Sequence, residues 1–249
     1  MTIDYGFDNI PKNLRTVVTI GSFDGVHRGH RVLLSALKSM AKRLNAESVV
    51  VTFDPHPRIA MGRDEGMGLL TTIQERAYLL HKEGVDRMVV AHFDDTFRQQ
   101  PYELFVRESL VAQLGMVGMV VGYNHRLGRG SEGNYATLQP LAAACGFEIE
   151  QVAQHLVEGG KISSTVVRNI IASGDMREVE RMLGEQYLIA GNAVDGIIEI
   201  ADKHKLLPKS GVYDAVVEFM GISHSATINI INRRVEIDTP LSGDVIIKI

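Results

Sequence analysis

The chain has 249 residues, of which 45% are hydrophobic and 22% are charged, an ordinary globular composition with room for one large domain and one small one. Its 26 basic and 30 acidic residues give a net charge of −4, which provides no general attraction to nucleic acid or to an anionic membrane. Cys145 is the single cysteine, so an internal disulfide is excluded and a reducing, cytosolic compartment is expected. We expect neither a secretory leader nor a membrane helix, because no apolar run approaches the roughly 20 residues that a span needs.

Strand-like and helix-like segments alternate over the first three quarters of the chain. Short β-branched or apolar runs predict strands over Thr16–Ile20, Ser48–Phe53, Arg87–Phe93, Val117–Gly122 and Phe147–Val152. This alternation indicates an α/β fold with a parallel sheet and helices on both faces. Since ligands bind where loops leave the carboxyl ends of such strands, the glycine-rich and proline-rich loops after these strands should converge on one crevice.

Helices are predicted between these strands from apolar spacing and terminal signals. Leu33, Leu37, Met40 and Leu44 fall on one helical face after the first strand. The Thr72–Glu75 tetrapeptide is a capping box, and Gly84 suits the residue after that helix. Further helices are expected from Pro101 to near Gly115, up to Gly146, over Ser163–Ala172, and over Met176–Leu183 with Asp175 and Glu178 as a capping pair.

The chain from Tyr187 onward is typical of a small β-rich domain. Short β-rich runs cover Val212–Phe219, Ala226–Ile231, Val235–Ile237 and Val245–Ile249, with polar turns between them. We place the domain boundary in Glu185–Ala190, giving a first domain over residues 1–186 and a second over 187–249. With roughly 60 residues, the second domain is near the size at which a β-domain needs support from a neighbour.

A glycine-rich segment, G-S-F-D-G-V-H-R-G-H over residues 21–30, carries the clearest chemical signal. Glycines let the backbone approach a ligand closely, and a helix start supplies free N–H groups and partial positive charge, which suit phosphate. His27 and His30 are three residues apart and can point at the same oxygens. The alternative is a plain strand-to-helix loop whose histidines satisfy backbone groups. The histidine pair around Gly29 favours phosphate binding.

Three hydroxyl residues and an arginine form a second candidate phosphate grip. Ser163, Ser164 and Thr165 precede the predicted helix, and Arg168 follows one turn later. Helix capping alone accounts for one hydroxyl. The other two, with an arginine that can fork onto phosphate oxygens, suggest an anion site.

Two other loops carry weaker signals. Thr52–Pro57 reads T-F-D-P-H-P, a stiff loop in which Phe53 offers a stacking face. The Gly122–Gly130 loop contains Arg126 and Arg129, which without context are solvated loop charges.

Two phosphate-gripping helix starts at one crevice suit transfer at the α-phosphorus of a nucleotide. An incoming phosphate oxygen attacks in line and pyrophosphate leaves. A phosphomonoester is already an anion at neutral pH, since its second pKa is about 6, so no general base is required. Positioning and charge stabilisation supply most of the catalysis. His27, His30 and Arg168 would offset the phosphate charge together with Mg²⁺.

These four segments, in this order, resemble the bacterial bifunctional riboflavin kinase/FAD synthetase family over Val17–Leu188. The matching motifs are G-x-F-D-G-V-H-x-G-H, T-F-D-P-H-P and I-S-S-T-x-x-R. The resemblance implies a Rossmann-like HxGH nucleotidyltransferase fold and transfer of AMP from ATP to FMN, giving FAD and pyrophosphate with Mg²⁺ as the metal. It also implies a flavin- and ATP-binding cytoplasmic enzyme.

The resemblance assigns roles position by position. The phosphate-binding, catalytic residues would be His27, His30 and Arg168. The remaining ATP-binding residues would be Gly21, Ser22, Phe23, Asp24, Gly25, Asn124, Arg126, Ser163, Ser164 and Thr165. The flavin-binding loop would be Phe53, Asp54, Pro55, His56 and Pro57. The family's G-x-[DN]-F-x-F-G loop is Gly122–Gly128 here, with His125 and Leu127 in place of two aromatics.

The C-terminal part departs from the family's kinase domain. Gly191–Gly196 keeps the start of that domain, and Leu207–Tyr213 resembles a later segment, but the intervening P-T-A-N element is missing. The acidic catalytic region and closing helix of the family are missing too. We therefore expect a degenerate, truncated β-domain without riboflavin kinase activity. Its role would be to cover the transferase or to mediate self-association into a homo-oligomer.

Two alternatives stay open at the level of sequence. The same nucleotide loop serves transferases that act on nicotinamide mononucleotide, phosphopantetheine or glycerol phosphate. Alternatively, a duplicate that lost its kinase serves as a flavin or nucleotide sensor, or binds a protein partner, which predicts ligand binding without turnover. The changed residues His125 and Leu127 favour the sensor, and the intact His27, His30 and Arg168 favour the enzyme.

Overall fold

The computed structural model describes residues 1–63, 67–153, 156–157 and 160–249. They form two compact units that interleave along the chain. The first comprises Met1–Phe23, Gly29–Glu65 and Leu79–Gly159, and the second comprises Asp24–Arg28, Gly66–Tyr78 and Gly160–Ile249. Within the described residues, no helix has both the length and the apolar character that a membrane crossing requires.

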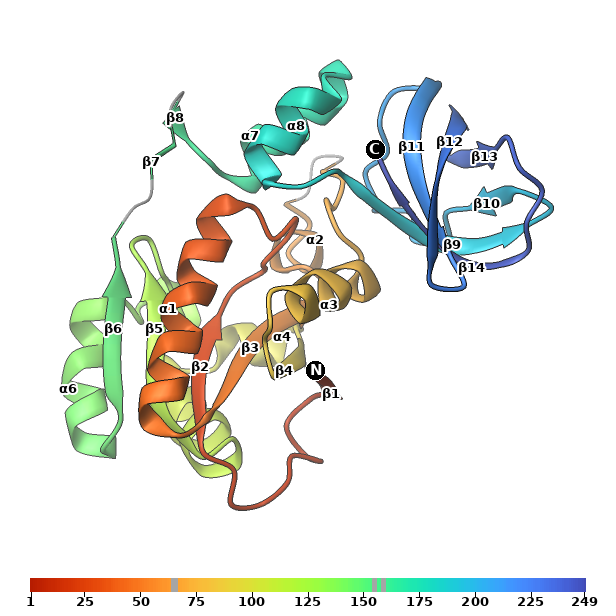
Figure 1. Ribbon diagram of the computed structural model, residues 1–249. Coiled ribbons are helices and arrows are strands. Elements are labelled where there is room, and N and C mark those ends of the chain that lie inside the picture. Colours follow the sequence, from red (N-terminus) through yellow and green to blue (C-terminus); the bar gives the residue numbers. More distant parts are fainter. Residues whose placement is uncertain (64–66, 154–155, 158–159) are drawn as a thin grey trace. The chain divides into compact units, whose positions relative to one another are not determined.

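The first unit is built on a six-stranded parallel sheet with strand order β1-β4-β3-β2-β5-β6 (Figure 1). Its strands are β1 (Thr2–Tyr5), β2 (Thr16–Ile20), β3 (Glu47–Asp54), β4 (Arg87–His92), β5 (Met116–Gly122) and β6 (Glu148–Val152). The chain runs from β2 outward to β3 and β4, then returns to place β5 on the other side of β2. This reversal is a topological switch point, where α/β sheets bind ligands. The predicted α/β class with a parallel sheet is confirmed.

The helices that belong to this sheet follow the strands in turn. They are α1 (Arg28–Leu44), α2 (Pro57–Ala60), α3 (Ile73–Lys82), α4 (Asp95–Gln99), α5 (Tyr102–Leu104), η1 (Phe105–Gln113), the 3₁₀ turn η2 (Arg129–Ser131) and α6 (Tyr135–Cys145). Helices α1 and α3 run across the division between the two units. The predicted capping box of α3 is confirmed, because Thr72 N donates to Glu75 Oε2 (2.8 Å) and Glu75 N donates to Thr72 Oγ1 (3.2 Å).

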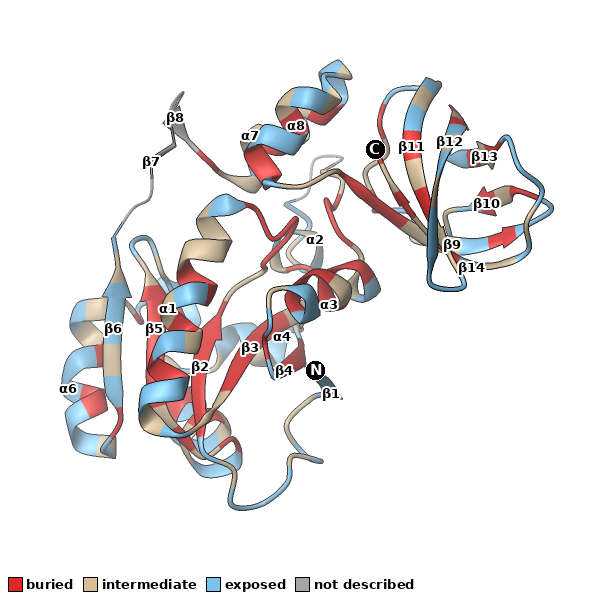
Figure 2. Ribbon diagram, viewed as in Figure 1, coloured by how far each residue is buried: buried red, intermediate tan, exposed pale blue. Residues whose placement is uncertain are grey.

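The core of this unit lies on both faces of the central strands, which are buried in Figure 2. One hydrophobic cluster joins alternate strand residues such as Val18 and Val49 to η1 and α6. The buried face of α1, which includes Leu34 and Leu37, lies outside that cluster. Because successive strand residues point to opposite faces, the two sets cover the two sides of the sheet.

The second unit contains two helices and a closed barrel. The helices are α7 (Ser164–Ser173) and α8 (Met176–Leu183), each ended by a left-handed glycine. The barrel has the order β10-β13-β12-β11-β14-β9. Its strands are β9 (Leu188–Val194), β10 (Ile197–Glu199), β11 (Gly211–Phe219), β12 (Ile222–Ile231), β13 (Arg234–Ile237) and β14 (Gly243–Lys248). The predicted small β-rich C-terminal domain is thus a closed antiparallel barrel, which leaves no open sheet edge. Two short strands, β7 (Leu156–Val157) and β8 (Gly160–Lys161), precede α7.

Several expected elements differ in detail. The helix predicted from Pro101 is α5 followed by the π-helix η1, and no residue pattern signals that wider winding. Strand β12 begins at Ile222 rather than at the predicted Ala226. The sequence did not signal this longer start, because three of its four residues, Ser223, His224 and Ser225, carry polar side chains. Asp175 caps α8 by accepting a hydrogen bond from Glu178 N (3.1 Å). The Glu178 carboxylate, predicted to complete the capping pair, forms an ion pair with Arg181 instead.

Candidate active site

The loop between β2 and α1 holds an unusual backbone conformation. Phe23 and Val26 have positive φ angles of 46° and 39°, and Gly25 between them has a φ of 84°. Glycine is favoured at this position because side chains rarely adopt such a φ angle, and a Cβ atom at Gly25 would also stand 2.7 Å from Leu70 Cδ1 and 3.2 Å from Leu70 Cβ. A positive φ at a β-branched valine is strained, and such strain persists only where the surroundings impose it, most often at functional sites.

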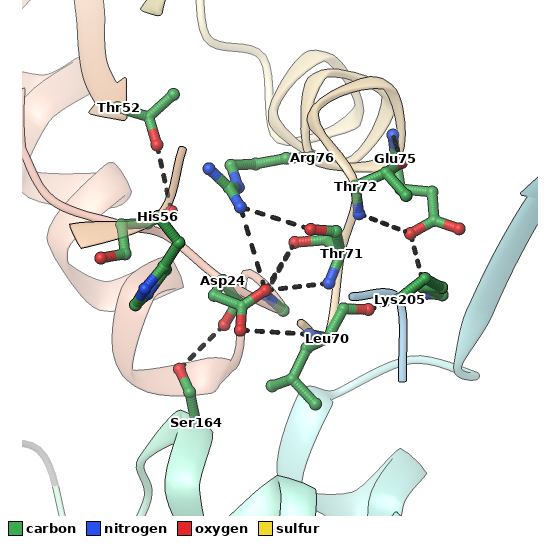
Figure 3. A network of polar contacts seen from close by, with 12 residues as sticks. Asp24, Thr52, His56, Leu70, Thr71, Thr72, Glu75, Arg76, Ser164 and Lys205 are labelled. Carbon is green, nitrogen blue, oxygen red and sulfur yellow. Dashed lines mark hydrogen bonds and ion pairs between the residues drawn. The ribbon is translucent and has the colours of Figure 1, made fainter. Parts of the chain in front are cut away.

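Asp24 lies at the centre of the polar network that holds this loop (Figure 3). Its carboxylate is 1% exposed and accepts hydrogen bonds from Leu70 N (3.1 Å), Thr71 N (2.9 Å) and Thr71 Oγ1 (3.1 Å). Its backbone carbonyl accepts a bond from Ser164 Oγ at 2.9 Å. Asp24 therefore ties together the loop, the segment before α3 and the start of α7.

Arg168 is the main cationic partner of Asp24. Its Nη2 lies 2.5 Å from Asp24 Oδ2, and its Nε donates to the Gly68 carbonyl at 2.7 Å. The buried Arg76 adds a longer contact of 3.9 Å from Nη2 to Asp24 Oδ1. The Asp24 carboxylate thus offsets part of the positive charge of Arg168, which the sequence analysis had predicted to face phosphate alone.

His27 follows this network directly, at the entry to α1. It is 7% exposed. Burial lowers the pKa of His27 to about 4, although a backbone hydrogen bond and the negative charge of Asp24 act to raise it. His27 is therefore neutral at pH 7, and it can offer a hydrogen bond rather than a charge to a ligand. His30 lies in the first turn of α1, with its ring 4.9 Å from that of Phe23.

The three hydroxyls before Arg168 have different environments. Ser163 caps α7 by accepting a bond from Val166 N (3.4 Å). Ser164 holds the Asp24 carbonyl, and Thr165 is exposed. The capping alternative therefore accounts for Ser163. The structure brings Ser164 and Arg168 onto Asp24.

A cavity of about 550 Å³ lies in the first unit, at the carboxyl ends of its strands. Its wall combines residues that follow β2, β3, β4 and β5, as expected for loops that converge at a switch point. Predicted site residues in the wall are Gly21, Ser22, Phe53, Pro57, Asn124 and Arg126. Asp54, Pro55 and His56 are absent from the described lining. His56 instead accepts a bond from Arg58 N (3.2 Å) through Nδ1 and caps α2.

Aromatic rings and arginines that the sequence did not single out also form this wall. Phe93, Phe97 and Phe105 line it with Phe53, and neighbouring rings meet edge to face with centroids 5.1–5.7 Å apart. Arg63 and Arg98 join Arg126 in the lining. A wall of ring edges and guanidinium groups fits a flat aromatic ligand with an anionic group. Phe93 directly follows β4, and a residue at the carboxyl end of a parallel strand could have been predicted to line the site for that reason.

His125 occupies the place of a family aromatic in the same wall. Burial lowers the pKa of His125 to about 4, so the ring is neutral at pH 7. Its Nε2 is buried and has no hydrogen-bond partner among the described residues. Leu127, the other changed position, is buried in the hydrophobic cluster of the sheet.

Described residues contain no group of three or more His, Cys, Asp or Glu side chains arranged to hold a metal ion. Mg²⁺ typically binds through substrate phosphates and one or two carboxylates rather than an all-protein cage. A metal carried on the phosphates of a nucleotide therefore fits the residues present.

The sheet, the switch-point cavity and the strained loop before α1 define a class: an α/β ligand-binding domain followed by a β-barrel. The sequence profile of FAD synthetases matches residues 9–166, and the chain belongs to the FAD synthetase family, a class of nucleotidyltransferases. The predicted family resemblance is confirmed.

Similar curated proteins support this membership. The chain is 33% identical to the bifunctional riboflavin kinase/FMN adenylyltransferase of Escherichia coli K12, over 87% of this chain and 72% of that protein. It is 34% identical to the protein of the same description from Haemophilus influenzae, over 72% of this chain but only 58% of that protein's length.

A solved structure shares the fold. The crystal structure of a macrolide-efflux protein from Streptococcus pneumoniae aligns with a TM-score of 0.84 and 24% identity, covering 100% of this chain and 98% of that one. At this identity the likeness concerns the fold alone.

Proposed function

We propose that this protein is an FMN adenylyltransferase that transfers AMP from ATP to FMN, giving FAD and pyrophosphate. Family membership carries the proposal, and the cavity wall supports it. The FMN phosphate oxygen attacks the α-phosphorus of ATP, the bond from that phosphorus to the bridging oxygen breaks, and pyrophosphate leaves. The reaction needs positioned phosphates more than it needs a base.

The residues divide into two groups in this proposal. Phe53 and Pro57 would face the flavin in the cavity, while Arg126 would meet phosphate there. On the nucleotide side, His27 and His30 would donate hydrogen bonds to ATP phosphates at the start of α1, where the helix dipole favours anions. Ser164 and Arg168 would hold the loop through Asp24 and present the arginine charge. Mg²⁺ would arrive with ATP and offset charge on the leaving pyrophosphate.

We further propose that the protein lacks riboflavin kinase activity. The support is the missing P-T-A-N element between Gly196 and Leu207. In this proposal the residues of 1–186 carry the reaction, and those of 187–249 serve it structurally.

Paired reactions test both statements. The purified protein is given ATP and Mg²⁺ with either FMN or riboflavin, and the products are separated by chromatography. FAD from FMN alone supports both proposals. FMN or FAD formed from riboflavin would overturn the loss of kinase activity. Flavin binding without any product would favour the sensor, and pyrophosphate release with another phosphorylated acceptor would favour a different transferase.

A further inference from the structure

Lys205 lies in the connection between β10 and β11 of the barrel and is almost fully buried, with 1% exposure. Its Nζ donates to Leu70 O (2.7 Å), Leu188 O (2.7 Å) and Glu75 Oε2 (2.8 Å). It also lies 4.3 Å from the ring centroid of Tyr187. An ammonium group has three N–H donors, so every donor of this lysine is used.

Glu75 links the barrel to the start of α3 through hydrogen bonds. The Glu75 and Lys205 side chains are both 0% exposed. Glu75 Oε1 accepts a bond from Ala190 N in β9 (2.8 Å), and Oε2 accepts one from Thr72 N (2.8 Å). One carboxylate therefore joins a barrel strand, the barrel lysine and the N-terminal cap of α3.

Thr71, which directly precedes Thr72, completes the path to the nucleotide loop. Thr71 N and Oγ1 both donate to Asp24 Oδ1, and Gly25 N donates to Thr71 Oγ1 at 3.1 Å. Figure 3 shows the contacts from Lys205 through Glu75 to Thr72 and those from Thr71 to Asp24, and the peptide bond between Thr71 and Thr72 joins the two sets. The loop residues Asp24–Arg28 and the segment before α3 belong to the same compact unit as the barrel.

A second contact fixes the Lys205 segment against the same strip of chain. Leu69 N donates to His204 O (2.6 Å), and Leu206 N donates to Leu69 O (2.8 Å). From the turn after β12, Arg233 Nη1 donates to the Lys205 carbonyl at 3.0 Å. Lys205 is thus held by barrel residues on one side while its side chain holds residues 70–75 on the other.

A buried ion pair of this kind is weak evidence for stability, because desolvation of two charges offsets their attraction. Its better-attested use is to select one arrangement of the groups around it. The arrangement selected here includes the positive φ angles of Phe23, Gly25 and Val26, which need rigid surroundings to persist.

We propose that Lys205 is a positioning residue for the ATP site, and that the barrel serves as the support that holds the His27 loop in its ligand-ready conformation. The inference rests on the proposed role of His27 and its neighbours in nucleotide binding. It gives the C-terminal barrel a function in the transferase reaction that does not require kinase chemistry.

The test compares Lys205→Met with Lys203→Met, an exposed lysine two residues earlier in the same connection. Calorimetry measures the binding of α,β-methylene-ATP, which cannot transfer AMP, and kinetics give separate KM values for ATP and FMN. We expect Lys205→Met to bind the analogue about tenfold more weakly and to raise the KM for ATP by a similar factor, with the KM for FMN unchanged. Lys203→Met should match the wild type.

A second variant separates positioning from folding. Lys205→Met leaves the Glu75 carboxylate buried without its cation, which can unfold the chain. The double variant Glu75→Gln/Lys205→Met removes both charges. We expect it to retain the circular dichroism spectrum of the wild type while its affinity for the analogue stays low. Wild-type affinity in any folded variant that lacks Lys205 would overturn the proposal.

Hydrogen exchange on the wild type gives a readout that needs no variant. If the loop and barrel are coupled, the ATP analogue should slow exchange at Leu70, Thr71 and Ala190 amides, and leave β12 unchanged. Unchanged exchange at all three amides on binding would contradict the inference. If the wild type binds no ATP analogue at all, the proposed function itself fails. If it binds and makes FAD while Lys205→Met behaves identically, only the positioning role fails.

Discussion

Arg168 Nη2 lies 2.5 Å from Asp24 Oδ2, while its Nε holds the Gly68 carbonyl at 2.7 Å. One guanidinium group therefore joins α7 to two loops that are distant in sequence. A planar fork with fixed donor directions can serve both acceptors at once, whereas an ammonium on a flexible stem presents a point charge.

Arg168→Lys should therefore lose function despite keeping its charge. We expect kcat/KM for FAD formation to fall on the order of 100-fold, because small displacements of positioned groups have effects of that size. Steady-state kinetics with ATP and FMN measure it. Lys42→Arg, on the exposed end of α1, is a matched control for the reverse exchange. If kcat/KM of Arg168→Lys stayed within twofold of the wild-type value, the fork geometry of the guanidinium group would not be what the site requires.

Asp24→Asn should destabilise the protein strongly. The substitution removes a buried charge that faces Arg168 and replaces an acceptor of Leu70 N and Thr71 N. Breaking one partner of a buried pair costs about 3–5 kcal/mol. Urea unfolding measures this free energy. Glu236→Gln, which breaks the exposed pair with Arg234, should change it by about 1 kcal/mol or less. Equal effects of the two substitutions would contradict the central role of Asp24.

Stability should fall as the pH decreases from about 6.5 to about 4. Burial lowers the pKa of His27 and of His125 from 6.5 to about 4. In this window the unfolded chain binds protons that the folded chain does not, so the free energy of unfolding rises with pH. Each histidine contributes a slope of at most about 1.4 kcal/mol per pH unit. Urea unfolding at several pH values gives the slope for the wild type, His27→Gln and His125→Phe.

Each of those two variants should have a flatter profile than the wild type. Histidine ring signals in NMR titrations give the two pKa values directly, with the variants providing the assignments. A pKa near 6.5 for either residue would show that its ring is more hydrated in solution than its position indicates.

His125→Phe should stabilise the protein and improve flavin binding. The change removes a buried Nε2 that lacks a partner among the described residues and restores the aromatic of the family motif. Relief of an unsatisfied polar group is worth about 1–3 kcal/mol, and the new ring would extend the aromatic wall of Phe53 and Phe97. Thermal unfolding and FMN fluorescence titration measure the two effects. Tyr123→Phe, at a side chain 57% exposed, should change neither. Weaker FMN binding by His125→Phe would indicate that the imidazole itself contacts the flavin.

Much of the fold follows from local sequence signals. The run Thr16–Ile20 was predicted with the bounds that β2 has, and α8 over Met176–Leu183 likewise. The Thr72–Glu75 box and the glycine after α6 were predicted because caps depend on residues within one turn. The edge strand β1 was missed because its four residues are mostly exposed and carry no apolar run.

Some residues of the candidate site could also be predicted from local sequence, and others could not. The loops after β2, β3 and β5 were recognisable from glycines, prolines and histidines, and a parallel sheet brings such loops together by its topology. Phe97, Phe105 and Arg63 in the cavity wall were not recognisable, because each looks ordinary in its own segment.

The sequence by itself determined the parallel α/β class, the β-rich C-terminal part and the family, because periodicity, caps and spaced motifs are local properties of the chain. Only the tertiary structure decided that Asp24 pairs with Arg168 and that His27 is neutral. The same holds for the contact of Lys205 with Glu75, which lies 130 residues away in the sequence. The physical reason is that burial and pairing depend on which distant side chains meet. Desolvation then sets the charge that each carries.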